Sequence, residues 1–170
     1  MIPGPIMTAD PEPDPATITI NLEIAHASWQ EALPRLEALV QQVGAEVSQK
    51  VEARGEVAIQ CADDTAIKAL NAQFRGKDHP TNVLAFPDET EGRLGDIILA
   101  YETVASEAQA QHKSFANHTA HLVLHGLLHL LGYDHQSDTE AEAMEQFEIE
   151  ILARMGIPNP YEMTTEEPGT

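Results

Sequence analysis

The sequence predicts an α+β fold, in which a small mixed β-sheet of about four strands is covered by helices on one side. Apolar and polar residues alternate over 18–24, which is the period of a half-buried strand. Short runs with strand character recur at 56–61, 83–86 and 95–100, between segments of helical period. The resulting order of strand, helix, strand, helix, two strands and three helices favours a layered α+β domain.

The first part of the chain predicts a tail, a strand and a helix. Residues 1–16 contain five prolines and no basic side chain, so we expect a disordered, proline-rich acidic tail. The strand at 18–24 is followed by a helix over 28–43, which Gly44 is expected to end. Pro34 falls in the first turns of this helix, where proline is best tolerated.

The middle and last parts of the chain predict a helix that leads to Arg75, then two strands, then three helices. The helix after the second strand is capped by Asp63 or Asp64 and delivers Arg75 to a loop. The last three segments of helical period are 103–111, 114–131 and 138–155. We therefore expect one domain over 17–157, followed by a flexible tail over 158–170.

Three histidines in the segment 125–135 have the spacing of an open metal site. His125 and His129 are four residues apart, so they lie on one face of a helix that the surrounding leucines predict to be buried. Gly132 can end this helix and let the chain return His135 to the same point. Three protein ligands leave the fourth tetrahedral position to water or substrate, which is typical of catalytic zinc. The segment predicts a buried helix that binds zinc or a similar divalent ion.

One departure separates this segment from the metal-binding pattern of metzincin peptidases. The spacing matches H-E-x-x-H-x-x-G-x-x-H, but Gly126 stands where the general base glutamate is needed. Ordinary peptidase chemistry is therefore disfavoured. Asp134 is a candidate substitute base or an acceptor that orients a ligand, and a turn-stabilising role is equally favoured. His121 is a candidate to orient a ligand histidine, or, like His118, a hydrogen-bonded core residue.

Three ordered motifs resemble those of the YbeY family of bacterial single-strand-specific endoribonucleases. They are H-G-x-x-H-L-x-G-Y-D-H at 125–135, N-x-x-F-R-x-K-x-x-P-T-N-V-L-A-F-P at 71–87 and L-G-D-I at 94–97. The resemblance covers about residues 17–157. Asn82 and Ala85 stand where aspartate and serine are frequent in the family, and neither position is an expected ligand.

The resemblance implies a zinc-dependent endoribonuclease of ribosomal RNA processing. One zinc ion would be held by His125, His129 and His135, with Arg75 and His125 as catalytic residues. The implied role is 3′ end maturation of small-subunit ribosomal RNA and ribosome quality control. The guanidinium of Arg75 suits a phosphate and stays charged at any working pH. Lys77 is expected to add a less directional phosphate contact.

Charge constrains how the protein meets RNA. The chain carries 28 acidic and 9 basic side chains, a formal net charge of −19, which opposes RNA at long range. Six of the nine cations lie between residues 50 and 93. We expect weak, salt-sensitive binding of free single-stranded RNA and recruitment by the small ribosomal subunit or a basic ribosomal protein. The sequence leaves the oligomeric state open.

Cysteine count and hydropathy predict a cytoplasmic protein without a membrane segment. Cys61 is the only cysteine, so no intramolecular disulfide can form. No apolar stretch approaches the 18 or so residues of a membrane span, and the N-terminus lacks the pattern of an export signal. Two alternative functions stay open: a zinc metalloprotease-like hydrolase with another base, and a non-catalytic ribosome assembly factor with structural zinc.

Overall fold

The computed structural model describes residues 17–134 and 136–162. The predicted tail over 1–16 lies outside these residues, as do His135 and residues 163–170. The elements in chain order are β1 (Ile18–Ile24), α1 (Ala27–Ala32), α2 (Leu36–Val51), β2 (Gly55–Ala62), α3 (Asp64–Arg75), β3 (Val83–Pro87), β4 (Arg93–Ala100), α4 (Tyr101–Ala110), α5 (Phe115–Leu130) and α6 (Asp138–Arg154).

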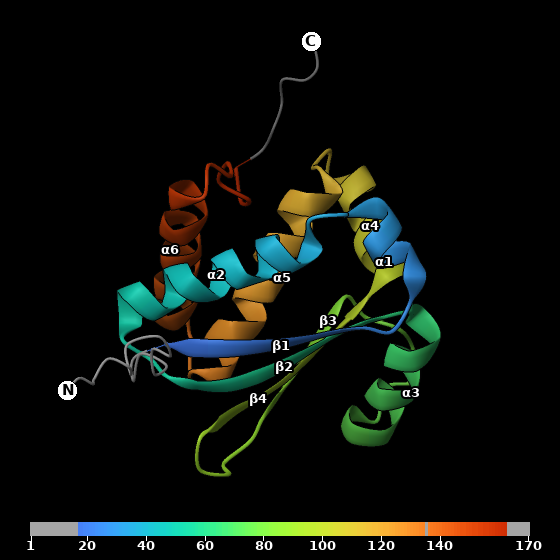
Figure 1. Cartoon of the computed structure of the whole chain (residues 1–170), viewed down its shortest axis with the longest axis horizontal. Coiled ribbons are helices and arrows are strands. Elements are labelled where there is room, and N and C mark those ends of the chain that lie inside the picture. Colours follow the sequence, from blue (N-terminus) through green and yellow to red (C-terminus); the bar gives the residue numbers. More distant parts are fainter. Residues whose placement is uncertain (1–16, 135, 163–170) are drawn as a thin grey trace, which may run out of the picture.

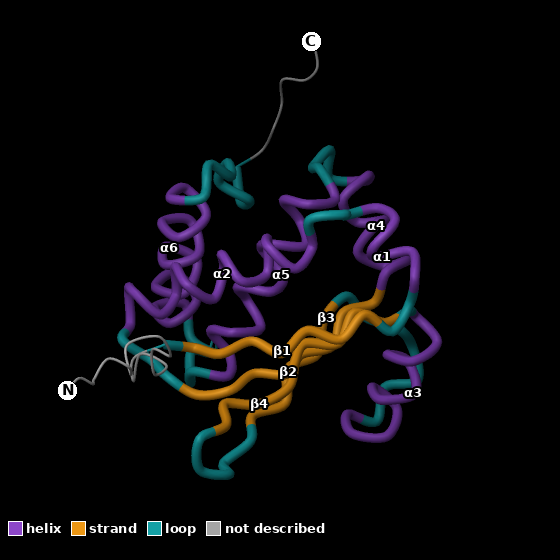
Figure 2. The backbone as a smooth tube through the Cα atoms, in the orientation of Figure 1, coloured by secondary structure: helices purple, strands orange, loops and turns teal. Residues whose placement is uncertain are grey.

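The four strands form one mixed sheet, as predicted. Their order is β1-β2-β4-β3, with β1, β2 and β4 parallel and β3 antiparallel to β4 (Figure 2). β3 is therefore an edge strand, and Ala85 is paired with Ile97 of β4. The free edge of β3 is available to side chains from other elements.

Helices cover both faces of the sheet, so the prediction of helices on one side is wrong in this respect. α2, α5 and α6 lie on one side of the sheet, and α3 lies on the other (Figure 1). Ile67 of α3 packs in a small second core with Leu84 and Ile98. The central strand β4 is accordingly buried on both faces, and its residues 97–100 form a continuous apolar run instead of an alternating one.

The predicted helix over 28–43 is two helices, and Gly44 does not end the second one. α1 ends at Ala32 and α2 begins at Leu36, with Pro34 in the turn between them. α2 then runs through Gly44 to Val51. A Cβ at Gly44 would lie 2.6 Å from Cδ1 of Ile20 in β1. This glycine therefore serves close packing of α2 on the sheet, which the sequence does not show.

Local capping places the two segments that carry the predicted site residues. Asp63 is the N-cap of α3, since its Oδ1 accepts a hydrogen bond from Ala66 N at 2.9 Å. Gly76, in the left-handed conformation, ends α3 directly after Arg75. Gly132, with φ +99°, follows the end of α5 as predicted.

Residues beyond the predicted domain boundary at 157 still contact the domain. Lys113 Nζ donates a hydrogen bond to the carbonyl oxygen of Pro160 at 2.8 Å. The contact ties residues 158–162 to the turn between α4 and α5 and brings Tyr161 toward α5. Within residues 17–134 and 136–162, no helix combines the length and apolar character required to cross a membrane.

Candidate active site

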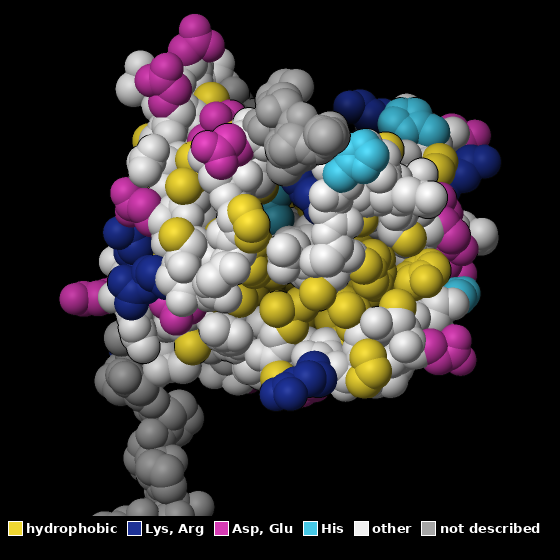
Figure 3. Space-filling model, turned by 90° about the horizontal axis from the view of Figure 1, so that it is seen from above, with side chains coloured by type: hydrophobic (Ala, Val, Ile, Leu, Met, Phe, Trp, Pro, Cys, Tyr) yellow, Lys and Arg dark blue, Asp and Glu magenta, His cyan; other side chains and the backbone are white. Residues whose placement is uncertain are grey.

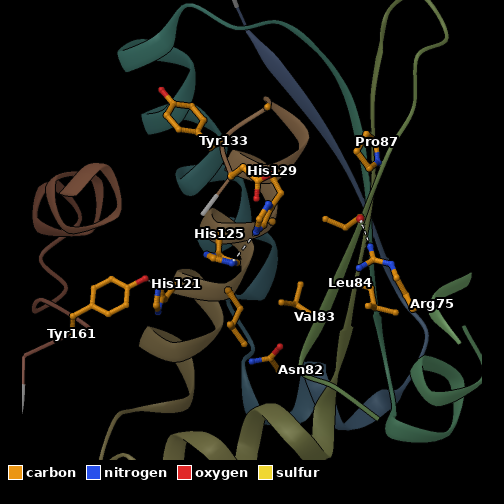
Figure 4. A pocket seen from close by; sticks show the side chains of 15 residues that line it. Arg75, Asn82, Val83, Leu84, Pro87, His121, His125, His129, Tyr133 and Tyr161 are labelled. Carbon is orange, nitrogen blue, oxygen red and sulfur yellow. Dashed lines mark hydrogen bonds between the residues drawn. The ribbon is translucent and has the colours of Figure 1, made fainter. Parts of the chain in front are cut away.

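A cleft of about 570 Å³ lies between α5 and the edge strand β3. Its histidines come from the buried helix α5, and Arg75 reaches it from the end of α3 (Figure 4). The site residues that line it are Arg75, His121, His125, His129, Asp134 and Tyr161. Arg75 lies far from these histidines in the sequence, 46 positions before His121 and 54 before His129. They share one cleft because α5 packs beside β3.

His125 and His129 converge as the helical spacing predicts. Their Nε2 atoms are 3.1 Å apart, and Figure 4 shows the two rings facing each other. Two nitrogens that each lie about 2.0–2.1 Å from one tetrahedral zinc ion are roughly 3.3 Å apart, so the pair fits a shared ion. His135, the third predicted ligand, lies outside the described residues. Among the residues that are described, no three histidine, cysteine, aspartate or glutamate side chains are placed to hold one metal ion.

A buried carboxylate on α6 holds the histidine wall of the cleft. Glu148 has no exposed surface, and it accepts hydrogen bonds from His125 Nδ1 at 2.7 Å and from His121 Nε2 at 2.9 Å. The hydroxyl of Tyr161 donates a third hydrogen bond to Glu148. Burial alone would raise the pKa of Glu148, but these hydrogen bonds outweigh it and lower the pKa to about 2.

The ionised carboxylate of Glu148 determines which ring nitrogen of His125 carries a proton. A carboxylate can only accept hydrogen bonds, so Nδ1 of His125 carries a proton and donates it toward Glu148. In the neutral ring, the lone pair is then on Nε2, the atom that faces His129. A carboxylate behind a ligand histidine is the usual arrangement in metal sites, because it sets the tautomer and orients the ring. This donor set fits a divalent ion.

Glu148 and Tyr161 belong to the site but are not predicted from the sequence. One signal for Glu148 is present in α6, where the buried positions are Met144, Glu148, Ile151 and Leu152. This is the spacing of a single helix face, and a glutamate in the middle of an apolar stripe needs buried partners. Tyr161 has no comparable signal, because it reaches the site through the irregular segment after α6.

The opposite wall of the cleft is built from β3 and the end of α3. Arg75 Nη2 donates a hydrogen bond to the carbonyl oxygen of Ala85 at 3.0 Å. Its guanidinium carbon lies 5.3 Å from the centroid of the Phe86 ring. Figure 4 shows Arg75 beside β3, across the cleft from the two histidines. Lys77, the other predicted phosphate contact, is exposed and does not line the cleft.

The remaining candidates divide between the cleft and the core. Asp134 lines the cleft, close in sequence to the third predicted ligand. His121 lines it too and contacts Glu148, so it belongs to the hydrogen-bond network behind the predicted ligands His125 and His129. His118 is buried against Glu107, with its Nε2 2.9 Å from Oε1, and burial lowers the pKa of its imidazole. His118 therefore occupies the core position that the sequence left open.

Gly126 lies where a peptidase would need its glutamate, and a Cβ there would be crowded by Ile97 of the sheet. A Cβ at this position would lie 3.0 Å from Cδ1 of Ile97 and 3.2 Å from its Cγ1 and Cγ2. Ile97 is fully buried on β4. The glycine thus favours close packing of α5 on the sheet, and any side chain here would require Ile97 to shift by a few tenths of an ångström.

Comparison with known proteins gives the family. The sequence model described as endoribonuclease YbeY matches residues 23–156, which contain all three motifs and both walls of the cleft apart from Tyr161. The chain belongs to this family. YbeY relatives include a protein from a Bradyrhizobium species, 43% identical over 84% of this chain and 92% of its own length, and one from Paramagnetospirillum magneticum, 44% identical over 85% and 96%. Both are described as endoribonuclease YbeY.

A solved structure supports the YbeY fold over the same region. The solution structure of a Thermotoga maritima protein superimposes with a TM-score of 0.56 at 28% sequence identity, covering 90% of this chain and 99% of that one. The family match confirms the resemblance predicted from the three motifs and, with it, the prediction of an endoribonuclease.

Proposed function

We propose that this protein cleaves single-stranded RNA as a zinc-dependent endoribonuclease. One observation carries the proposal: the imidazoles of His125 and His129 converge on one wall of a cleft whose other wall carries the guanidinium of Arg75. A phosphodiester in this cleft would lie between a metal-binding pair and a permanent cation. Such a site is suited to stabilise charge that builds on phosphorus.

In this proposal His125, His129 and His135 hold one Zn²⁺ ion. When bound, the ion would supply a Lewis acid and lower the pKa of a water molecule. Glu148 keeps the Nε2 lone pair of His125 directed into the cleft by accepting the Nδ1 proton. Arg75 binds a non-bridging phosphate oxygen, and its hydrogen bond to Ala85 keeps the guanidinium on the cleft wall.

The attacking group is either water or the neighbouring 2′-hydroxyl of the RNA, and the two routes leave different products. End-group analysis of a cleaved single-stranded oligoribonucleotide separates them. Cleavage that yields a 2′,3′-cyclic phosphate indicates attack by the 2′-hydroxyl, whereas cleavage of an oligonucleotide without 2′-hydroxyls requires water. Absence of RNA cleavage by the zinc-loaded protein would contradict the proposal, whichever route is used.

The biological substrate in this proposal is ribosomal RNA, with 3′ end maturation of the small-subunit RNA and ribosome quality control in the cytoplasm. The net charge of −19 supports recruitment by a basic protein of the small subunit rather than capture of free RNA. Figure 3 shows acidic and basic side chains around the edges of one face of the molecule, with hydrophobic side chains gathered in its middle. Binding of free RNA is expected to depend on contacts between its phosphates and cations such as Arg75, so it should weaken steeply as salt is added.

The packing of Gly126 provides a direct test against the peptidase alternative. We expect Gly126→Glu to lower the free energy of unfolding by about 1–3 kcal/mol, because the added Cβ crowds Ile97. Ile97→Ala should destabilise the Gly126→Glu protein by less than it destabilises the wild type, measured by urea unfolding, because it also removes the crowding. Wild-type stability of Gly126→Glu would contradict the crowding by Ile97, and cleavage of casein by the wild-type protein would contradict the proposed substrate.

A further inference from the structure

A pair of aromatic rings, one exposed and one half-buried against the second core, lies next to the catalytic cleft on the α3 side of the sheet. Phe74, in the last turn of α3, is 59% exposed. Its ring meets that of Phe86 on β3 edge to face, with the centroids 5.5 Å apart. We call these two residues the aromatic shelf. The shelf lines one end of a groove of about 450 Å³, which also includes Leu70 of α3 and Ile98 of β4.

Arg75 joins the aromatic shelf to the catalytic cleft. Its guanidinium lines the cleft, donates to Ala85 on the free edge of β3, and lies 5.3 Å from the centroid of the Phe86 ring. A phosphate bound by Arg75 would therefore have its neighbouring nucleotide beside Phe86 and Phe74. The shelf is in this sense a continuation of the cleft around the edge of the sheet.

We propose that the aromatic shelf is a nucleobase subsite, on which an unpaired base of the RNA strand stacks next to the phosphate that Arg75 binds. The proposal rests on the proposed cleavage of RNA at the adjacent cleft. Aromatic rings bind bases of any sequence, because every base presents a π-face. Only an unpaired base has that face available, so the subsite selects single strands over duplex.

Charge around the shelf supports a nucleotide at this position. Residues 65–77 contain Lys68, Arg75 and Lys77 and no aspartate or glutamate, in a chain with a net charge of −19. Glu23 and Asp96 also line the groove. These carboxylates repel phosphates, so the base is expected to enter the groove while the backbone stays on the side of Arg75 and Lys77.

The experiment combines a change in the protein with a change in the RNA. Steady-state cleavage of a short single-stranded RNA is compared with cleavage of RNAs in which one base at a time is replaced by hydrogen. We expect one abasic position near the scissile bond to raise KM about tenfold for the wild-type protein, with little change in kcat. Phe74→Ala should raise KM by a similar factor on intact RNA and add no further increase with that abasic RNA. Phe74→Tyr keeps the ring and should restore the wild-type KM.

The controls separate failure of the subsite from failure of the proposed function. If the wild-type protein cleaves the RNA but Phe74→Ala has an unchanged KM, or if its effect multiplies with every abasic substitution, the subsite is excluded while the endoribonuclease stands. If the wild-type protein does not cleave RNA, the proposed function fails and the subsite with it.

A second copy of this chain is the other possible occupant of the aromatic shelf, and sedimentation of the wild-type and Phe74→Ala proteins tests it. A change of oligomeric state on Phe74→Ala would contradict a nucleobase subsite. Thermal unfolding should be unchanged, since the Phe74 side chain is largely exposed.

Discussion

The two walls of the cleft are built by different physical means. On the α5 wall, His121 and His125 are held by a fully buried carboxylate, Glu148, which also accepts a hydrogen bond from Tyr161. On the β3 wall, Arg75 is held by one backbone carbonyl and one aromatic face. The first wall belongs to the core and the second to the edge of the sheet.

This difference indicates a division of labour. Metal ligands must converge within a few tenths of an ångström, which calls for rings fixed by buried hydrogen bonds. A phosphate-binding guanidinium tolerates looser positioning, and Arg75, exposed at the end of α3, is positioned by one hydrogen bond and one ring contact. Changes on the α5 wall should therefore alter metal affinity, and changes on the β3 wall should alter cleavage without altering metal affinity.

The largest expected effect is that of Arg75→Ala on cleavage. Loss of the guanidinium should lower kcat about 10²–10³-fold, because charge on the transition state loses its stabilising cation. Zinc affinity and thermal stability should stay at wild-type levels, since Arg75 makes no contact with the α5 wall in the described residues. Arg35→Ala removes the same charge from the exposed start of α2 and is the matched control. If Arg75→Ala lost zinc together with activity, the two walls would not be separable.

The same Arg75→Ala variant decides between catalysis and a purely structural role of the metal. A non-catalytic assembly factor would show no RNA cleavage that depends on Arg75. Loss of cleavage with zinc and fold intact would exclude that alternative.

The next effect in size is that of Glu148→Gln on metal affinity. An amide cannot match the ionised carboxylate as an acceptor from two imidazoles and a hydroxyl, so zinc affinity should fall about 10–100-fold. Competition with a chromophoric chelator measures this change. Glu150→Gln is the control, because Glu150 lies on the same helix but forms an exposed ion pair with Lys50. Equal zinc affinity in the two variants would contradict a role of Glu148 in metal binding.

The smallest expected effect is that of Tyr161→Phe. It removes one hydrogen bond to Glu148 and leaves the two from the histidines, so zinc affinity should fall by less than about tenfold, or roughly 1 kcal/mol. Tyr133→Phe is the control, since the ring of Tyr133 packs on Phe147 and also lines the cleft. A loss with Tyr161→Phe as large as that with Glu148→Gln would show that the segment after α6 is as important as the buried carboxylate.

The α5 wall could be predicted from the sequence only as far as local geometry reaches. The spacing of His125 and His129 fixes their shared face on one helix, and it predicted the convergence of the two Nε2 atoms. Glu148 comes from another helix, and its place behind the histidines depends on how α6 packs against α5. Its position on the apolar face of α6 predicts that Glu148 is buried, but it does not predict which side chains donate hydrogen bonds to Glu148.

Gly44 shows the same limit in the fold. A glycine at the end of an apolar period predicts a helix end, yet here α2 continues through Gly44, and the missing side chain leaves room for Ile20 of the neighbouring strand. The position of α3 on the second face of the sheet could not be predicted for a related reason. Residues 97–100 of the central strand β4 are apolar without alternation, which fits a strand buried on both faces but does not say which helix covers each face. In both cases the local sequence fits two structures, and tertiary packing decides which of them forms.

The most direct test of the account is the zinc content of the wild-type protein and of His129→Ala at the same buffered free zinc concentration. We expect one zinc ion per wild-type chain, less than about a tenth of that in His129→Ala, and the same thermal unfolding for the two metal-free proteins. Equal zinc content in the two proteins, or a wild-type protein that takes up none, would contradict a metal site built on the converging histidines of α5.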